Sequence, residues 1–383
     1  MRGTDIAELQ EGRGWTRSRL VHELRLVARR LDVGELPSDE SLKRMIRQWI
    51  SGSRGLSDFH ADLLTAAFGV PFAAGRPSEE IADRAATYPT ADELRARLDQ
   101  VRAVVDSQLV DLLEAHTDGL RALDRRLGAR KLLAQTKAHV GQVTDLLTYA
   151  LPGGVRPALA AAAAEAAALA GWQALDLGRP DDAWLLHETA KTAARECEAP
   201  AVLAHVTAQQ AYALLDVDKP ADSLALIQHA REAADGEVPG VMHGWLWAAL
   251  AESLAAVGEE GRCRRALDEA ARLIAHSDGE QLPYLFLDPV HLARWRGHCL
   301  ARLGCAEAVN DLASALADLD PSFTRAASGL HCDLALAYSQ RGEHDAALAH
   351  AGEAAQLAAQ TSSARQRRRI SELLTSGGGS IVG

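Results

Sequence analysis

Four polar side chains near the start of the sequence have the chemistry to read the edges of DNA bases. Arginine can pair with guanine and glutamine with adenine through two hydrogen bonds each, while lysine holds phosphate oxygens. The four residues are Lys43, Arg44, Arg47 and Gln48. Their spacing places all four on one side of a helix, opposite Met45 and Trp49. They are candidates for a DNA-reading face, and the alternative is a basic helix face that is merely solvated.

The distribution of charge favours the first interpretation. Residues 1–60 contain 11 Arg and Lys against 9 Asp and Glu, whereas the remaining 323 residues contain 30 against 43. The net charge of −11 therefore hides a small basic region ahead of an acidic chain. Other side chains in that region are candidates for phosphate contacts. They are Thr16, Arg17, Arg19 and Arg54.

Short helices are expected to position these residues. Residues 1–72 contain four helix patterns with apolar side chains at three- and four-residue spacing. Thr16 and Ser57 are the expected N-caps of the second and fourth helices, and Gly69 is expected to end the fourth. Pro37 and Ser38 are expected to start the third helix. The apolar stripes are Ile6 and Leu9; Leu20, Val21, Leu24 and Val27; Leu42, Met45, Ile46 and Trp49; and Leu63, Leu64 and Phe68.

The segments Leu9–Thr16 and Leu42–Arg54 resemble the Cro/C1-type (XRE) helix-turn-helix family. In that family the recognition helix ends in an aromatic or aliphatic residue, a glutamate, any residue and a glycine. Here Trp49, Ile50, Ser51 and Gly52 stand at these positions. The resemblance implies a DNA-binding domain over residues 1–72 that presents the four polar residues to the major groove.

The second half of the sequence is repetitive. A turn segment around residue 178 recurs around 218 and 258, with weaker copies at 304 and 342. Seven residues before each of these positions the side chain is small: Gly171, Ala211, Ala251, Gly297 and Ala335. A second column, twelve residues after, is mostly alanine. Small columns let two helices approach closely, and a glycine between them supplies a positive φ, so the pattern predicts a stack of helix pairs.

These columns resemble the tetratricopeptide repeat (TPR) over roughly residues 160–360. The resemblance implies an all-α, right-handed solenoid over residues 131–362, in which the first helix of each pair lines a concave groove. We used the repeat columns to transfer this groove geometry to the sequence. The groove positions then hold Trp172, His205, Tyr212, Trp245, Glu252, His291, Arg294 and His298, with Asp176, Asp216 and Arg302 near the rim. This mixture of aromatic and charged groups suits a peptide or a polar small molecule. The alternative places the tryptophans in the core between repeats.

Two segments connect and end these domains. Residues 73–130 are expected to contain a Pro- and Gly-rich linker and one long amphipathic helix over about 92–127. That helix is expected either to pack on the next domain or to form a coiled coil between two copies, which makes it a candidate dimerisation element. Residues 363–383 contain a basic run, Arg365 and Arg367–Arg369, and then a Gly- and Ser-rich segment. We expect a solvated helix end and a flexible tail there, with a phosphate contact as the alternative.

The sequence argues against several classes of protein. The 74 alanines and the aromatic content of 4% argue against a β-sandwich or barrel. No GxGxxG after a strand, GxxxxGK[ST], GxSxG or HExxH motif occurs, so we expect neither an enzyme nor a metal or cofactor site. Five cysteines without a CxxC pair, and no run resembling a signal peptide or membrane span, predict a cytoplasmic protein.

The order of the two domains resembles that of bacterial transcription regulators. The sequence therefore favours a DNA-binding regulator that senses a peptide or small-molecule ligand and binds two half-sites as a homodimer. The alternative is an interaction scaffold, in which the TPR-like domain binds a protein partner and the helix-turn-helix serves only for docking.

Overall fold

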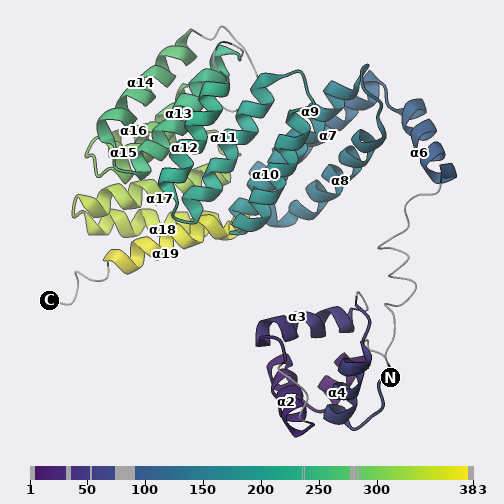
Figure 1. Cartoon of the computed structure of the whole chain (residues 1–383). Coiled ribbons are helices and arrows are strands. Elements are labelled where there is room, and N and C mark those ends of the chain that lie inside the picture. Colours follow the sequence, from purple (N-terminus) through teal and green to yellow (C-terminus); the bar gives the residue numbers. More distant parts are fainter. Residues whose placement is uncertain are drawn as a thin grey trace. The chain divides into compact units, whose positions relative to one another are not determined.

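The chain consists of two compact helical units. The computed structural model describes residues 5–31, 36–51, 54–73, 91–234, 236, 238–276, 282, 284–285 and 287–377. The described residues contain helices and turns and no strand, so the predicted all-α class is confirmed. Residues 1–96 form one unit and residues 97–383 the other. We call them the head and the body and describe each by itself (Figure 1).

The head contains the four predicted helices. They are α1 (Ile6–Gly12), α2 (Arg17–Arg30), α3 (Asp39–Ile50) and α4 (Asp58–Phe68). The side chains of Thr16, Ser38 and Ser57 each accept a backbone N–H three residues on, at 3.2–3.4 Å. Gly69 ends α4 with a φ of 63°. The polar residues at these positions therefore set the helix boundaries as the sequence predicts.

The apolar stripes of these helices face one another in the head core. Leu20 and Leu24 on α2, Trp49 on α3 and Phe68 on α4 are all buried. The Arg13 guanidinium donates to the carbonyls of Ala67 and Phe68 at the end of α4, where carbonyl groups lack helical partners. Gly52 and the predicted linker over residues 74–90 lie outside the described part of the chain.

The body is built from five consecutive helix pairs. They are α9 (Arg156–Asp176) with α10 (Pro180–Ala194), α11 (Pro200–Asp216) with α12 (Pro220–Ala233), α13 (Gly240–Ala256) with α14 (Glu260–Ala275), α15 (Pro289–Arg302) with α16 (Ala308–Ala317), and α17 (Thr324–Gln340) with α18 (His344–Thr361). The five residues predicted to turn between the members of a pair all have positive φ, from 58° to 78°. They are Gly178, Asp218, Gly258, Gly304 and Gly342. Helix pairs of this kind make the body a TPR-like array.

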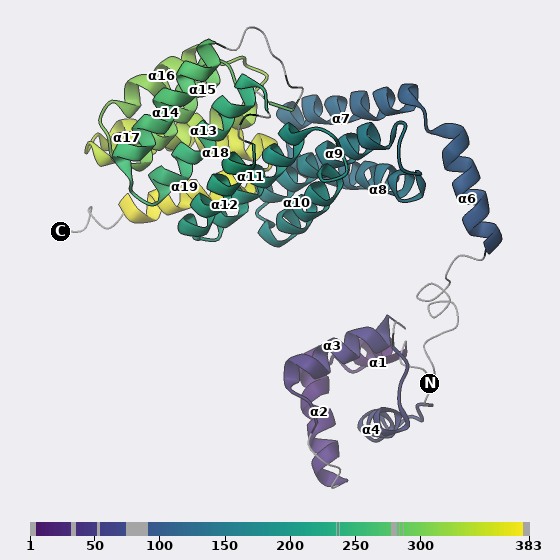
Figure 2. The ribbon, with the colours of Figure 1, turned by 45° about the horizontal axis from the view of Figure 1, so that its top comes forward.

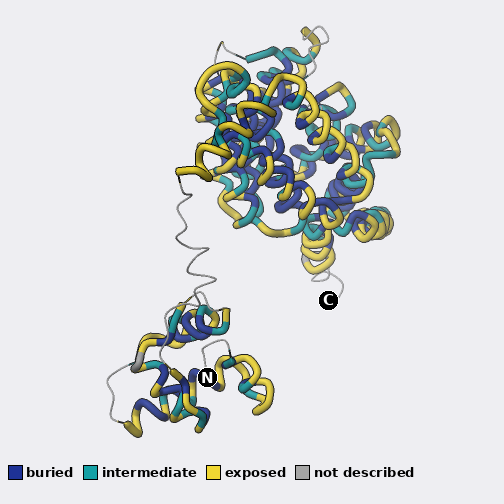
Figure 3. Tube along the Cα trace, turned by 90° about the vertical axis from the view of Figure 1, so that its right-hand side faces the viewer, coloured by how far each residue is buried: buried dark blue, intermediate teal, exposed yellow. Residues whose placement is uncertain are grey.

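The small-residue columns lie where the paired helices touch. A Cβ added at Gly171 would come within 2.5 Å of the His187 ring, and one at Gly297 within 2.5 Å of Leu312. The alanines of both columns are buried. Figure 3 shows this burial on the inward-facing side of the body helices. Close helix packing therefore explains the columns.

The prediction of one long helix over residues 92–127 is wrong, because two helices occupy that segment. They are α6 (Ala91–Val104) and α7 (Ser107–Leu127). Asp106 starts the second one, since its carboxylate accepts the N–H of Leu109 at 2.8 Å. A 3-10 turn, η2 (Ala129–Lys131), and α8 (Leu133–Tyr149) follow, and α7 and α8 both pack against α9. The segment from α7 onward thus belongs to the body rather than to a linker.

The last helix, α19 (Ala364–Gly377), also belongs to the body, so the predicted solvated basic end is wrong. It packs against α17, α18 and α9 (Figures 1 and 2). Ser363 fixes its start, because the Ser363 hydroxyl accepts the N–H of Gln366 at 3.2 Å and donates to Asp176 at 2.7 Å. Asp176 is therefore buried at this junction and does not lie on a groove rim.

The two ends of the helix array meet, so the body closes on itself instead of forming an open groove. Arg325 on α17 donates to the carboxylate of Asp124 on α7, and its Nε lies 3.6 Å from Asp176 on α9. Gly128 has a φ of 79°, and a Cβ there would overlap the backbone of Thr361 at the end of α18. These long-range contacts correct the prediction of a concave groove, because the groove is closed into a cavity.

Helix α9 is the central helix of this arrangement. Within the described residues it alone is long and apolar enough to cross a membrane by length and composition, but most of it is buried inside the body. Its run of alanines contacts neighbouring helices on several sides. An alanine-rich helix with little amphipathicity is expected at such a position.

Candidate functional site

The third helix of the head presents the four residues predicted to read DNA. Arg44 and Arg47 are exposed, while Lys43 and Gln48 are half-buried. Met45, Trp49 and the rest of the apolar stripe face the core. Lys43 Nζ lies 2.9 Å from Glu40 on the same helix, so part of its charge is balanced locally. The arrangement leaves the guanidinium groups accessible on one face of α3.

The four candidate phosphate contacts lie at helix ends. Thr16 caps α2, and Arg17 and Arg19 are exposed in its first turn, with Arg19 2.6 Å from Glu23. Arg54 is exposed just after α3, and its backbone N–H donates to the Gln48 carbonyl at 3.1 Å. The side chains therefore surround the start of α2 and the end of α3, while contact with phosphate stays a prediction.

The body contains a cavity of about 1010 Å³. All eight residues predicted for the ligand groove line it, and all eight are on the first helices of their pairs. They are Trp172 on α9; His205 and Tyr212 on α11; Trp245 and Glu252 on α13; and His291, Arg294 and His298 on α15. The structure thus gathers the eight residues at one place, although helices α7, α17 and α19 also form its wall.

The aromatic residues match both interpretations, a position in the ligand groove and a position in the core. Tyr212 and Trp245 belong to the buried core of the body, and both line the cavity. Trp172 packs against that core and meets Tyr212 edge-on, with ring centroids 6.0 Å apart. These aromatic residues therefore belong to the core of the body and also form part of the cavity wall.

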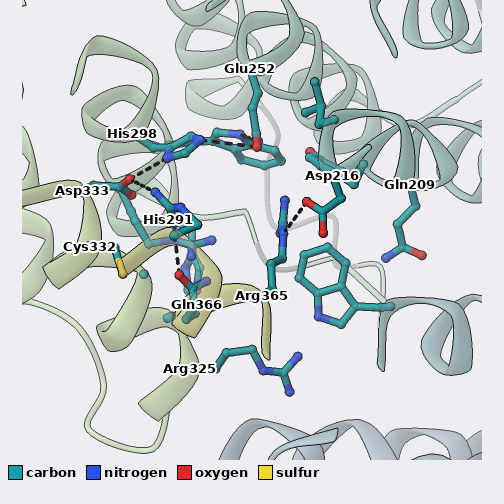
Figure 4. A pocket seen from close by; sticks show the side chains of 18 of the residues that line it. Gln209, Asp216, Glu252, His291, His298, Arg325, Cys332, Asp333, Arg365 and Gln366 are labelled. Carbon is teal, nitrogen blue, oxygen red and sulfur yellow. Dashed lines mark hydrogen bonds and ion pairs between the residues drawn. The ribbon is translucent and has the colours of Figure 1, made fainter. Parts of the chain in front are cut away.

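One network of charges joins four helices, α13, α15, α17 and α19, across the cavity (Figure 4). His298 Nδ1 lies 2.8 Å from Asp333 Oδ1, and Nε2 lies 3.4 Å from Glu252 Oε1. Arg369 on α19 also donates to Asp333, and Trp295 Nε1 donates to Glu252 at 2.7 Å. Although burial opposes its charge, the two carboxylates raise the pKa of His298 to about 9. The imidazole is therefore protonated at neutral pH.

A second cluster attaches α19 to α11. Arg365 Nε lies 3.0 Å from Asp216 Oδ1, and Arg368 lies 3.1 Å from Asp216 Oδ2. The Arg365 guanidinium also lies over the Trp172 ring, 5.6 Å from its centroid. Sequence reasoning did not place these arginines in the site. The one available signal was the four-residue spacing of Arg365 and Arg369, which puts both on one face of a helix.

Several polar atoms in the cavity wall are buried without a hydrogen-bond partner among the described residues. They include Arg294 Nε, the Tyr212 hydroxyl and His205 Nδ1. Tyr212 is 5% exposed and His205 is 4% exposed. Burial lowers the pKa of His205 to about 3, so its ring is neutral, and burial raises the pKa of Tyr212. Unpartnered polar groups at one buried site are unfavourable unless something else binds them.

The cavity wall also contains a carboxyl group, Glu165, that changes protonation near neutral pH. Burial raises the pKa of Glu165 to about 7, although Arg121 lies 3.3 Å away and opposes the shift. No group of three or more His, Cys, Asp or Glu side chains with metal-binding geometry is found in the described part of the chain. The cavity is therefore lined by ion-paired charged groups, by aromatic rings and by a few polar groups without a hydrogen-bond partner among the described residues.

Comparison with known proteins gives structural similarities of low score. No protein-family model matches the sequence, and no curated protein matches it. BtubC (BKLC) from P. vanneervenii has 16% identity and a TM-score of 0.41, covering 60% of this chain and 91% of that one. A putative kinesin light chain from Podosopora anserina with nearly identical TPR-like repeats has 15% identity and a TM-score of 0.33, covering 51% and 94%.

A third solved structure is that of Bacillus thuringiensis PlcR in complex with the peptide PapR7 and DNA. It has 13% identity and a TM-score of 0.29, covering 71% of this chain and 94% of that one. The assignment of the body as a TPR-like array therefore depends on its own helix pairs and turns.

Proposed function

We propose that the protein is a DNA-binding transcription regulator whose body senses a ligand. It acts in the cytoplasm by binding alone, without catalysis. The observation that carries the proposal is the exposed basic face of α3, opposite the buried stripe of the same helix. A helix with this division of faces can enter the major groove while its apolar side holds it to the domain.

The body supplies the sensing part of the proposal. Its cavity is large enough for a short peptide or a small polar molecule, and its wall contains unpartnered polar groups. Helices α7, α17 and α19 close the array around that cavity. A ligand that binds one arrangement of these helices better than another shifts the equilibrium between them by its difference in affinity.

Two heads are needed for specificity, because one small domain buries too little DNA surface. We therefore propose a homodimer that places two α3 helices in successive major grooves. The exposed leucines of α7, Leu112 and Leu123, are candidates for the contact between copies.

A gel-shift assay on promoter DNA tests the DNA-binding part. Substituting Lys43, Arg44, Arg47 and Gln48 together by alanine removes the groups proposed to contact bases. We expect sequence-specific binding to be lost, with a residual nonspecific affinity that falls steeply with salt through counterion release. Specific binding unchanged by the substitutions would contradict the proposal.

A matched control removes the same number of positive charges from the body. Arg195, Arg262 and Arg265 are exposed, and their joint replacement by alanine should leave specific binding intact. The alternative function, a TPR-like scaffold for a protein partner, predicts no affinity for duplex DNA in any of these proteins. Absence of binding between the wild-type protein and duplex DNA at low salt would favour that alternative.

A further inference from the structure

The cavity wall contains a half-buried cation, Arg294, whose Nε is buried. Arg294 projects from α15 into the cavity, and no hydrogen bond or ion pair engages its guanidinium among the described residues. We propose that Arg294 and Tyr212 together bind the carboxylate of an organic ligand. The inference rests on the proposed function, since it names the ligand class of the same cavity.

The charged groups near Arg294 pair with one another and not with its guanidinium. Arg365 and Arg369 on α19, and His298 on α15, are cations in the same wall. The carboxylates facing them are Asp216, Glu252 and Asp333, and each already binds one or more of these groups or Trp295. Each of these three carboxylates is thus engaged by neighbouring groups, Asp216 also by Arg368, whereas Arg294 has no ion pair among the described residues. An anionic ligand supplies that ion pair.

Tyr212 provides the second donor. Its hydroxyl lies in the cavity wall without a hydrogen-bond partner in the described part of the chain, and its ring is almost completely buried. Burial and the charge of Glu252 raise the pKa of this phenol, so the group keeps its proton and acts as a donor at neutral pH. A guanidinium and a phenol O–H can each donate to one carboxylate, and charge-assisted hydrogen bonds of this kind are strong.

The surrounding carboxylates favour a single negative charge over a double one. Glu252 and Asp333 act electrostatically on Arg294 although neither pairs with it. They would repel the second charge of a phosphate dianion more than they repel a carboxylate. The cavity chemistry therefore selects a carboxylic acid rather than a phosphate ester.

Aromatic rings determine what is attached to that carboxylate. Trp245 meets Trp295 edge-on with centroids 6.1 Å apart, and Trp172 meets Tyr212 in the same manner. His205, neutral because its pKa is lowered to about 3, meets Trp245 edge-on and lies tilted against Tyr284, and its Nδ1 has no hydrogen-bond partner among the described residues. This wall suits an apolar or aromatic group that also offers one polar atom.

Two sources share this chemistry, the C-terminus of a short peptide and a small organic acid. Isothermal titration of the full-length protein with three probes separates them: N-acetyl-phenylalanine, its primary amide, and 3-phenylpropionate. We expect both acids to bind, and the amide to bind at least about tenfold more weakly, because it lacks the charge that Arg294 requires. If the acetylated amino acid binds more tightly than phenylpropionate, a peptide C-terminus is indicated, and the reverse order indicates a small acid.

Two variants test the residues. Arg294→Gln should reduce the preference for acid over amide to near unity, and Tyr212→Phe, which removes only a hydroxyl, should weaken acid binding without changing the fold. Arg195→Gln is the control, because Arg195 is an exposed arginine of the body that does not line the cavity. Equal binding of acid and amide to the wild type, an unchanged preference in Arg294→Gln, or no binding of either acid at millimolar concentration would overturn the inference.

These titrations contain no DNA, so their failure is distinguishable from failure of the proposed function. Loss of ligand preference leaves the α3 result untouched, and absence of DNA binding leaves the preference for acids measurable. A protein that binds acids but not DNA would keep this inference while returning the function to the scaffold alternative.

Discussion

His298 occupies a position where its charge contributes to the stability of the body. Its two ring nitrogens face Asp333 on α17 and Glu252 on α13, while Arg369 on α19 approaches the first of these carboxylates. The folded protein therefore binds a proton at His298 more tightly than the unfolded chain does, because the pKa is raised from 6.5 to about 9. Stability from this group is complete below about pH 6.5 and is lost as the pH rises through about 9.

This yields a prediction for His298→Gln. The free energy of unfolding should differ from wild type by on the order of 3 kcal/mol near pH 6, and the difference should shrink as the pH approaches 10. Urea titrations followed by circular dichroism at intervals of pH measure it. A difference that stays constant over the whole range would show that the charge of His298 has no stabilising role.

At the scale of elements, α19 is the helix whose position depends most on charge. Arg365 pairs with Asp216 and Arg369 with Asp333, and both carboxylates are buried. Arg365→Met leaves the buried Asp216 carboxylate with only the more exposed Arg368 as its ionic partner, so the substitution should loosen the docking of α19 on α11. We expect amide hydrogen exchange in α19 to rise by at least about tenfold, with little change in α13.

Arg367→Met provides the comparison, since Arg367 lies on the same helix at an exposed position. Exchange in α19 should stay at the wild-type rate in that variant. Equal acceleration by both substitutions would mean that α19 responds to loss of any basic residue rather than to loss of the Asp216 ion pair.

The local elements could be predicted because their signals are local. Gly178 and Gly258 mark the turns, and Gly171 and Gly297 mark close contacts between paired helices, so a column pattern was enough to find the pairs. Asp218 has a φ of 58° without being a glycine, and the repeat spacing still located it. The eight cavity residues were found in the same way, by position within a repeat.

The remaining features depend on contacts between residues far apart in sequence. Arg325 binds Asp124, which lies 201 residues away, and Arg365 binds Asp216, which lies 149 residues away. No periodicity within a segment reports such pairs, so neither the closure of the array nor the place of α19 followed from the sequence. The division of the long helix was overlooked for a simpler reason, since Asp106 is an ordinary N-cap residue.

At the scale of the whole molecule, the chain combines a small head that has a basic helix face with a larger acidic body that contains a cavity. Residues 1–60 have a slight excess of positive charge, while the rest of the chain is strongly negative. Acidic surface outside the proposed DNA-binding head would repel duplex DNA and reduce nonspecific binding. The charge asymmetry therefore favours recognition through the head alone.

Selection of bound sequences from a random duplex library by the full-length protein is the most direct test of this account. We predict enrichment of a motif with two half-sites about 10 base pairs apart, or a multiple of that spacing, and no enrichment by the protein with the four α3 substitutions. Failure of the wild-type protein to enrich any motif, or enrichment of the same motif by the substituted protein, would contradict it.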